Sequence, residues 1–135
     1  LRNEILTSGI NDVSKSNQDC DLQSIDELSA LLKKTMVKLE KEAYDGRIPI
    51  MARSYFKEMY ETFDSIRRFL SDDAQILIDI GDSVFAGVHI KTDDILVELF
   101  ENLGYILQEK KVLRSRRSRD KTILSQSLLA FKYSA

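Results

Sequence analysis

The turn Gly81-Asp82-Ser83 follows directly on a short apolar run, residues 74–80. In open parallel sheets, ligands bind beyond the carboxyl ends of the strands, so a turn at this position is a candidate wall of a binding pocket. Gly81 permits close approach of the backbone, and Asp82 or Ser83 supplies a polar group. The alternative is that Gly81 only supplies the turn and Asp82 only caps it. Gly81, Asp82 and Ser83 are therefore substrate-pocket candidates.

A cluster of basic side chains lies between residues 114 and 121 of a chain whose net charge is −2. Because the pI is near 5.5, any binding of nucleic acid has to be local. Arginine matches the geometry of phosphate with paired donors, and such contacts position a protein on a duplex without specifying sequence. The alternatives are that the charges are solvated and incidental, or that Arg114 pairs with Asp79 or Asp82. The nucleic-acid-contact candidates are Arg114, Arg116, Arg117, Arg119 and Lys121.

His89 and Cys20 are each the only residue of their type. A catalytic histidine needs a partner and a substrate proton within reach, and the sequence indicates neither, so we expect a structural role for His89. One cysteine excludes an intramolecular disulfide and a cysteine-rich zinc site, which fits a reducing compartment, and a cytoplasmic location is predicted. The acidic pairs Asp72-Asp73 and Asp93-Asp94 are explained by a turn and a helix start. No metal site and no catalytic residue is predicted.

Length and composition predict one α/β domain to position these residues. The chain has 135 residues, of which 43% are hydrophobic and 31% are charged, as expected for a domain with a core. Its apolar runs are far shorter than the roughly 20 residues that span a bilayer, so no membrane partner is expected. Residues 1–23 are polar and aperiodic and predict a lead-in, followed by the domain over residues 24–135.

Helical periodicity first appears over residues 25–42, behind a capping box formed by Ser24 and Glu27. A connection is expected over residues 44–50, where Pro49 disfavours helical geometry for the residue before it. The run 74–80 predicts a strand buried on both faces, hence a parallel sheet covered by helices. The remaining expected elements are a helix over 52–70, a loop over 84–91, a helix from the N-cap Thr92 to Gly104, and strands over 105–113 and 124–133 that pair as a hairpin.

This ending, a buried parallel strand, a helix, a strand and a final antiparallel strand, resembles the carboxyl-terminal half of the class I methyltransferase fold. The succession over residues 45–135 is similar to the amino-directed DNA methyltransferases, the adenine-N6 and cytosine-N4 class, in the part after their catalytic motif. The resemblance implies half of a Rossmann-like sheet, ordered helix-helix-strand-helix-strand-strand. The segments that carry it are Ile48-Pro49-Ile50-Met51, Tyr55-Phe56-Lys57-Glu58-Met59, Ile66-Arg67-Arg68-Phe69-Leu70, Ile80-Gly81-Asp82-Ser83, Gly87-Val88-His89-Ile90 and Thr92-Asp93.

The resemblance implies a parent protein that uses S-adenosylmethionine and acts on DNA, for example in restriction-modification. The family's glycine-rich turn and its Pro-Pro-Tyr-like element have no counterpart here, since the one proline is Pro49. Residues 71–74 also replace the family's Pro-Gly-Gly-like turn. The isolated chain is therefore expected neither to methylate nor to hold cofactor tightly.

Two other functions remain open from the sequence, an RNA or tRNA methyltransferase and a degenerate module that only makes contacts. A half-sheet would leave the strand 74–80 with an unpaired edge. We therefore expect a homo-oligomer, or association with the missing half, through that edge or through the helix 25–42.

Overall fold

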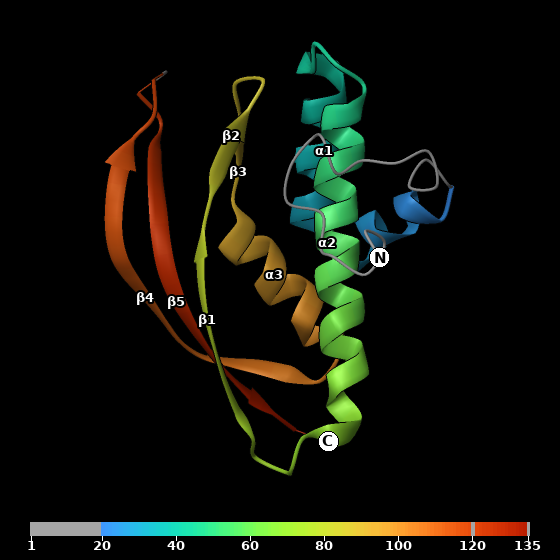
Figure 1. Cartoon of the computed structure of the whole chain (residues 1–135), viewed down its shortest axis with the longest axis vertical. Helices are drawn as coiled ribbons and strands as arrows, with labels where there is room; N and C mark the ends of the chain where they lie inside the picture. The colour runs from blue at the N-terminus through green and yellow to red at the C-terminus, as the bar shows by residue number, and fades with distance from the viewer. Residues whose placement is uncertain (1–19, 120, 135) are drawn as a thin grey trace, which may run out of the picture.

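The computed structural model describes residues 20–119 and 121–134 of the chain. They form a mixed α/β fold whose helices lie on one side of a twisted sheet (Figure 1). No helix in this part of the chain has both the length and the apolar character needed to cross a bilayer. The elements are η4 (Cys20–Leu28), α1 (Ala30–Glu42), α2 (Arg47–Ile66), η5 (Arg67–Phe69), β1 (Gln75–Gly81), β2 (Ser83–Phe85), β3 (Val88–Ile90), α3 (Thr92–Glu101), β4 (Tyr105–Arg117) and β5 (Ile123–Tyr133).

Helix α1 does not begin at the predicted capping box, because residues 20–28 form the 3₁₀ helix η4. Ser29 is the N-cap instead, and its hydroxyl accepts a hydrogen bond from the Leu32 amide at 3.0 Å. The same hydroxyl donates to Glu98 of α3 at 2.8 Å. A carboxylate at a helix N-terminus is favoured by the helix dipole, so a contact distant in sequence fixes this start. The predicted lead-in over residues 1–23 is wrong for its last four residues, and the rest lies outside the described residues.

Helix α2 begins at Arg47, within the segment 44–50 that was predicted to be a connection. Pro49 lies in its first turn, where backbone N–H groups have no intrahelical partner and a proline loses nothing. The side chain of Asp45 supports this start by accepting a hydrogen bond from the Arg47 amide at 2.9 Å. The buried face of α2 includes Ile48, Met51, Ala52, Phe56 and Met59.

The main sheet has the strand order β1-β5-β4, and β5 runs antiparallel to both neighbours. Strands β1 and β4 therefore point in the same direction, and the chain passes from one to the other through α3. The predicted hairpin of the last two strands is confirmed. The predicted parallel partner of residues 74–80 is wrong for the described residues, because β1 pairs with the antiparallel strand β5.

The apolar run of β1 predicted a strand buried on both faces, and this prediction is wrong. Its burial alternates residue by residue, and Leu77 is 67% exposed. The reason is that the helices cover one face of the sheet only (Figure 1). In addition, β1 stands at the edge of the described sheet, so the isoleucines on its inner face are only half-buried. An apolar run without alternation thus marks an edge strand here.

The segment 84–91, predicted to be a loop, contributes to a two-stranded hairpin formed by β2 and β3. The two turn residues, Ala86 and Gly87, have φ angles of 51° and 77°. Positive φ at both positions matches the right-handed twist of the flanking strands. After this hairpin α3 begins with Lys91 as its N-cap rather than the predicted Thr92.

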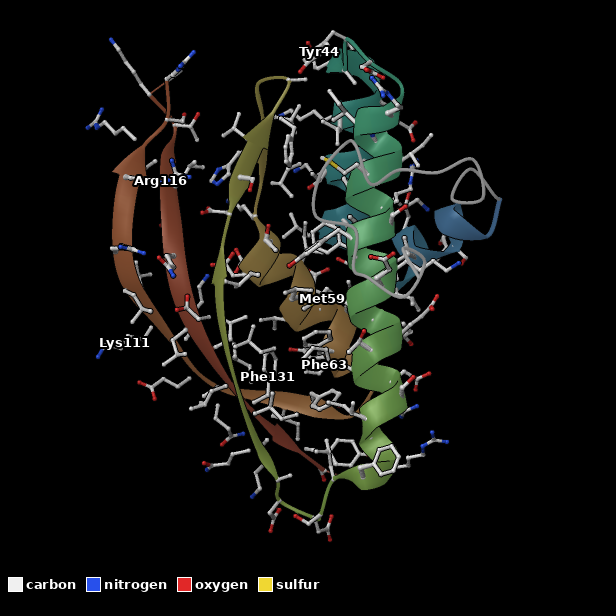
Figure 2. The ribbon with its side chains drawn as sticks, in the orientation of Figure 1. Tyr44, Met59, Phe63, Lys111, Arg116 and Phe131 are labelled. Carbon is white, nitrogen blue, oxygen red and sulfur yellow. The ribbon has the colours of Figure 1, made fainter. Side chains whose placement is uncertain are left out.

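The core lies between the helices and the inner face of the sheet. Figure 2 shows Met59 and Phe63 of α2 and Phe131 of β5 directed into this space. Helix α3 runs through it and is fully buried at four apolar positions, which form two adjacent pairs one turn apart. The largest side chains with almost no exposure are Tyr105, Phe56, Phe100, Phe131, Leu32, Met36 and Leu39.

Candidate nucleic-acid interface and adjoining cavities

Asp82 ties three elements together at the end of β1. Its Oδ1 accepts a hydrogen bond from the backbone N–H of Ser125 in β5 at 2.6 Å. Its Oδ2 lies 2.6 Å from Nε2 of His89 in β3. The side chain of Asp82 is only 6% exposed, so these two contacts occupy a buried carboxylate. The pocket candidate Asp82 and His89, for which a structural role was predicted, are thus partners, and Asp82 fixes the β2–β3 hairpin against the sheet.

Three cavities meet around the turn at residues 81–83. The first, here called the aromatic cavity, has a volume of about 190 Å³ and lies between α2 and the β2–β3 hairpin. The second, the central cavity, is about 500 Å³, and the third, the outer cavity, is about 410 Å³. Gly81 lines the first two and Ser83 lines the first and the third. The three substrate-pocket candidates therefore all border open space.

The basic stretch is only partly the loop that was predicted. Arg114, Arg116 and Arg117 lie within β4, and the chain then turns back into β5. The turn is closed by hydrogen bonds between the backbones of Ser118 and Thr122 at 2.9 Å and of Lys121 and Ser118 at 3.0 Å. Arginine backbones pair like any others, and at this end both faces of the strand are solvated, so β4 continues through the basic residues.

Four side chains of this stretch, here called the basic tip, are exposed and lack an ion-pair partner among the described residues. Figure 2 shows Arg116 at the end of β4, beyond the core. Arginine is always charged and lysine nearly so at neutral pH, and both have donors free to bind an anion. The basic tip consists of Arg116, Arg117, Arg119 and Lys121.

Arg114 differs from the basic tip because its guanidinium is already engaged. Its Nε donates to Oε1 of Gln126 at 2.5 Å, and Nε2 of Gln126 donates to Asp79 at 2.7 Å. The predicted direct pair between Arg114 and Asp79 or Asp82 is therefore replaced by a relay through the amide of Gln126. Arg114 also lines the central cavity. Of the five predicted contact candidates, Arg114 is the one held in place by the sheet.

Charged side chains elsewhere show what a structural role looks like in this protein. Lys110 of β4 lies 3.0 Å from Asp93 and 2.8 Å from Asp94 at the start of α3. Burial lowers the pKa of Lys110, but its hydrogen bonds to Asp94 and Asp93 outweigh this and leave the pKa above its ordinary value. Such a pair joins α3 to the sheet. Among the residues that the structure describes, the basic tip has no counterpart of these partners.

The aromatic cavity was missed from the sequence. Helical spacing placed Tyr55 in a core stripe, but in the structure it is half-buried and lines the cavity with Phe56 of α2 and Phe85 of β2. Burial raises the pKa of the Tyr55 hydroxyl. Phe85 reaches this wall because residues 83–90 form the β2–β3 hairpin, whereas the sequence predicts a loop over 84–91.

No group of three or more histidine, cysteine or carboxylate side chains among the described residues is placed to share a metal ion. Comparisons with models of known protein families, with curated proteins and with solved structures gave no match. The functional reading of this chain therefore depends on its own residues and geometry.

Proposed function

We propose that this chain is the carboxyl-terminal part of an S-adenosylmethionine-dependent methyltransferase of the amino-directed DNA class. The support is the arrangement of its last elements. The succession β1, α3, β4, β5 has two mutually parallel strands joined through a helix and a final strand that is antiparallel to both. This order supports the Rossmann-like half-sheet that the resemblance of residues 45–135 implies, while β1 departs from it by being an edge strand whose partner in the described sheet is antiparallel. The open turn at residues 81–83 follows the carboxyl end of β1, where such sheets bind ligands.

The observation that carries the contact with DNA is the basic tip. Its four cations have no ion-pair partner among residues 20–119 and 121–134, and they stand on a protein with a net charge of −2, so they form a local positive feature. The central and outer cavities border both this end of β4 and β5 and the turn at residues 81–83, which Asp82 ties directly to Ser125 of β5. Contacts of arginine with phosphate fix the register of a protein on a duplex. A target held by the basic tip lies beside the open turn.

Catalysis belongs to the parent protein. Transfer to an exocyclic amine requires an unstacked base oriented toward the sulfonium methyl group of the cofactor. This chain contributes pocket walls and a backbone contact, and the glycine-rich and Pro-Pro-Tyr-like elements belong to another segment or subunit. Calorimetric titration of S-adenosylmethionine into the chain, alone and with duplex DNA, should give no binding heat. Stoichiometric binding would contradict this division of labour.

The DNA contact is tested by fluorescence anisotropy with a labelled DNA duplex at several salt concentrations. The double variant Arg116→Glu/Arg117→Glu should lower the affinity by about tenfold or more and flatten the salt dependence, because fewer counterions are released. The matched control is Lys34→Glu/Lys38→Glu, which changes two exposed lysines of α1 and alters the net charge equally. Equal losses in both double variants would show a field effect and refute the contact. Tighter binding of an RNA stem than of DNA would instead favour an RNA methyltransferase.

We further propose that the chain associates with a second copy through the edge of β1. This strand carries one charged residue, Asp79, and has no proline, lysine or bulge, which are among the features that protect natural edges from pairing. Leu77→Lys places a charge at an exposed position of this strand, and Val37→Lys does the same on α1. Sedimentation should show a dimer that Leu77→Lys dissociates and Val37→Lys leaves intact. The reverse result would assign the interface to α1, and a monomeric wild type would refute self-association.

A further inference from the structure

The walls of the aromatic cavity are suited to a flat, unsaturated ring. Tyr55 and Phe56 meet edge to face, with ring centroids 5.2 Å apart and an interplanar angle of 77°. Phe85 lines the cavity from β2, across from α2, and Met51 adds a polarisable thioether. Aromatic walls and a thioether hold a π system by stacking and edge contacts. Ala52 leaves the space between them open because its side chain is a single methyl group.

The cavity also offers hydrogen-bonding groups that the described residues leave without a close partner. The hydroxyl groups of Tyr55 and Ser83 have no hydrogen-bond partner among the described residues, and both residues line the cavity. The Thr92 hydroxyl, also in the lining, makes only a long contact of 3.5 Å to the Ile90 carbonyl. An apolar space with a few polar groups is typical of a site that fixes the orientation of its ligand. A ring with donors and acceptors on its edge fits this chemistry better than a hydrocarbon does.

The size limits the occupant. At about 190 Å³ the cavity is smaller than the roughly 300–1,000 Å³ of pockets for drug-sized ligands, but it exceeds by far the roughly 30 Å³ of one water molecule. One ring system fits, and a sugar and a phosphate attached to it have to remain outside. The ligand is then a ring that enters from a larger molecule.

The surroundings of the aromatic cavity indicate which part of the ligand lies outside it. Ser83 and Phe85 line both the aromatic cavity and the outer cavity. Arg116, Arg117 and Arg119 of the basic tip line the outer cavity on its other side. Two shared residues thus join a ring site to the basic tip. Base stacking beside a positively charged groove is how proteins hold single-stranded nucleic acid.

We propose that the aromatic cavity holds one unstacked nucleobase while the basic tip holds the phosphate of the same strand. The inference rests on the proposed contact between the basic tip and nucleic acid and adds to it a site for a single base. The base stacks against the aromatic walls, and its edge reaches the hydroxyl groups of Tyr55 and Ser83. The site does not require that the bound base be the one that is methylated.

The experiment compares two labelled single strands of equal length by fluorescence anisotropy with the whole chain. One carries bases, and the other carries tetrahydrofuran spacers in their place, so that both present the same phosphates. The strand with bases should bind at least about five- to tenfold more tightly than the spacer strand, as stacking of one base on aromatic side chains implies. Ala52→Leu, which fills the cavity, should bring the two affinities together. Ala30→Leu, on the exposed start of α1, should leave the ratio unchanged.

A second variant protects the test against misfolding. Phe85→Ala removes a wall of the cavity at a partly buried position of the β2–β3 hairpin, at the margin of the core rather than within it. It too should abolish the preference for the strand with bases. Arg116→Glu/Arg117→Glu should weaken both strands equally and preserve their ratio. Equal binding of both strands, or a ratio unchanged in Ala52→Leu and Phe85→Ala, would overturn the base site alone, whereas failure of both strands to bind would overturn the DNA contact as well.

Discussion

The two ends of the three-stranded sheet are built in opposite ways. At the end where β4 begins and β5 finishes, aromatic rings of α2, α3 and the sheet pack with centroids between 4.4 and 6.4 Å apart. At the other end, arginines are exposed and three cavities surround the turn after β1. The rings of the closed end are those of Phe63, Phe100, Tyr105, Phe131 and Tyr133.

The closed end also satisfies the polar groups that it buries. The Tyr105 hydroxyl donates to the Phe63 carbonyl at 2.7 Å. Burial, and then the neighbouring Tyr133, raise the pKa of Tyr105 to about 12. Aromatic burial combined with satisfied hydrogen bonds supplies stability. Because this end anchors both long strands, the opposite end can expose unpaired charge and open space, the features that a binding site requires.

The largest effect on stability should come from Phe100→Ala. Phe100 is fully buried and contacts the rings of Phe63, Tyr105 and Phe131. Removing a buried phenyl ring creates a cavity, and the free energy of unfolding should fall by about 3–5 kcal/mol in urea titration. The control is Phe69→Ala, at a side chain that is 75% exposed, which should change it by less than about 0.5 kcal/mol. Similar losses in the two variants would mean that the closed end is not the anchor.

Gly104→Ala should have the next largest effect. Gly104 joins α3 to β4 with a φ of +96°, and a Cβ there would lie 3.1 Å from the Ser134 carbonyl oxygen. Both the left-handed backbone and the close contact oppose a side chain, so the free energy of unfolding should fall by about 2–3 kcal/mol in urea titration. Gly46→Ala is the matched control, since Gly46 has a φ of −62° and open space around it. Its melting temperature should stay the same or rise slightly, and a fall equal to that of Gly104→Ala would refute the backbone argument.

Between the two ends, Lys110→Met should have an intermediate effect. The substitution leaves Asp93, whose side chain is 7% exposed, without its cation. The free energy of unfolding should therefore fall by about 1–2 kcal/mol at neutral pH. The folded pKa of Lys110 lies above its ordinary value of 10.5, so this stability is complete below that pH and is lost as pH rises through the folded pKa. Urea titration should therefore show the difference between wild type and variant shrinking in strong alkali. A difference that persists there would mean that packing, not charge, is lost.

The sequence predicted elements better than the contacts between them. Periodicity located α3 and the β4–β5 hairpin because their patterns are local. It misplaced the start of α1, which Glu98 fixes from another helix, and it predicted burial of β1 on both faces, because an apolar run does not report whether helices cover one face of a sheet or both. In the candidate site, Arg116 was found from its charge. Phe85 was missed, since its role depends on a two-residue turn that juxtaposes β2 with α2.

The smallest effect on stability should come from the open end, where Arg116→Ser/Arg117→Ser removes two exposed cations. Neither guanidinium pairs with a described residue, so urea unfolding should change by less than about 0.5 kcal/mol. Removing positive charges that lie close together also relieves their repulsion, so a slight rise in the free energy of unfolding agrees with the prediction as well as no change does. A loss comparable to that of Lys110→Met would show that the basic tip serves the fold. Unchanged stability together with weakened DNA binding would mean that these arginines are present for a partner outside the chain.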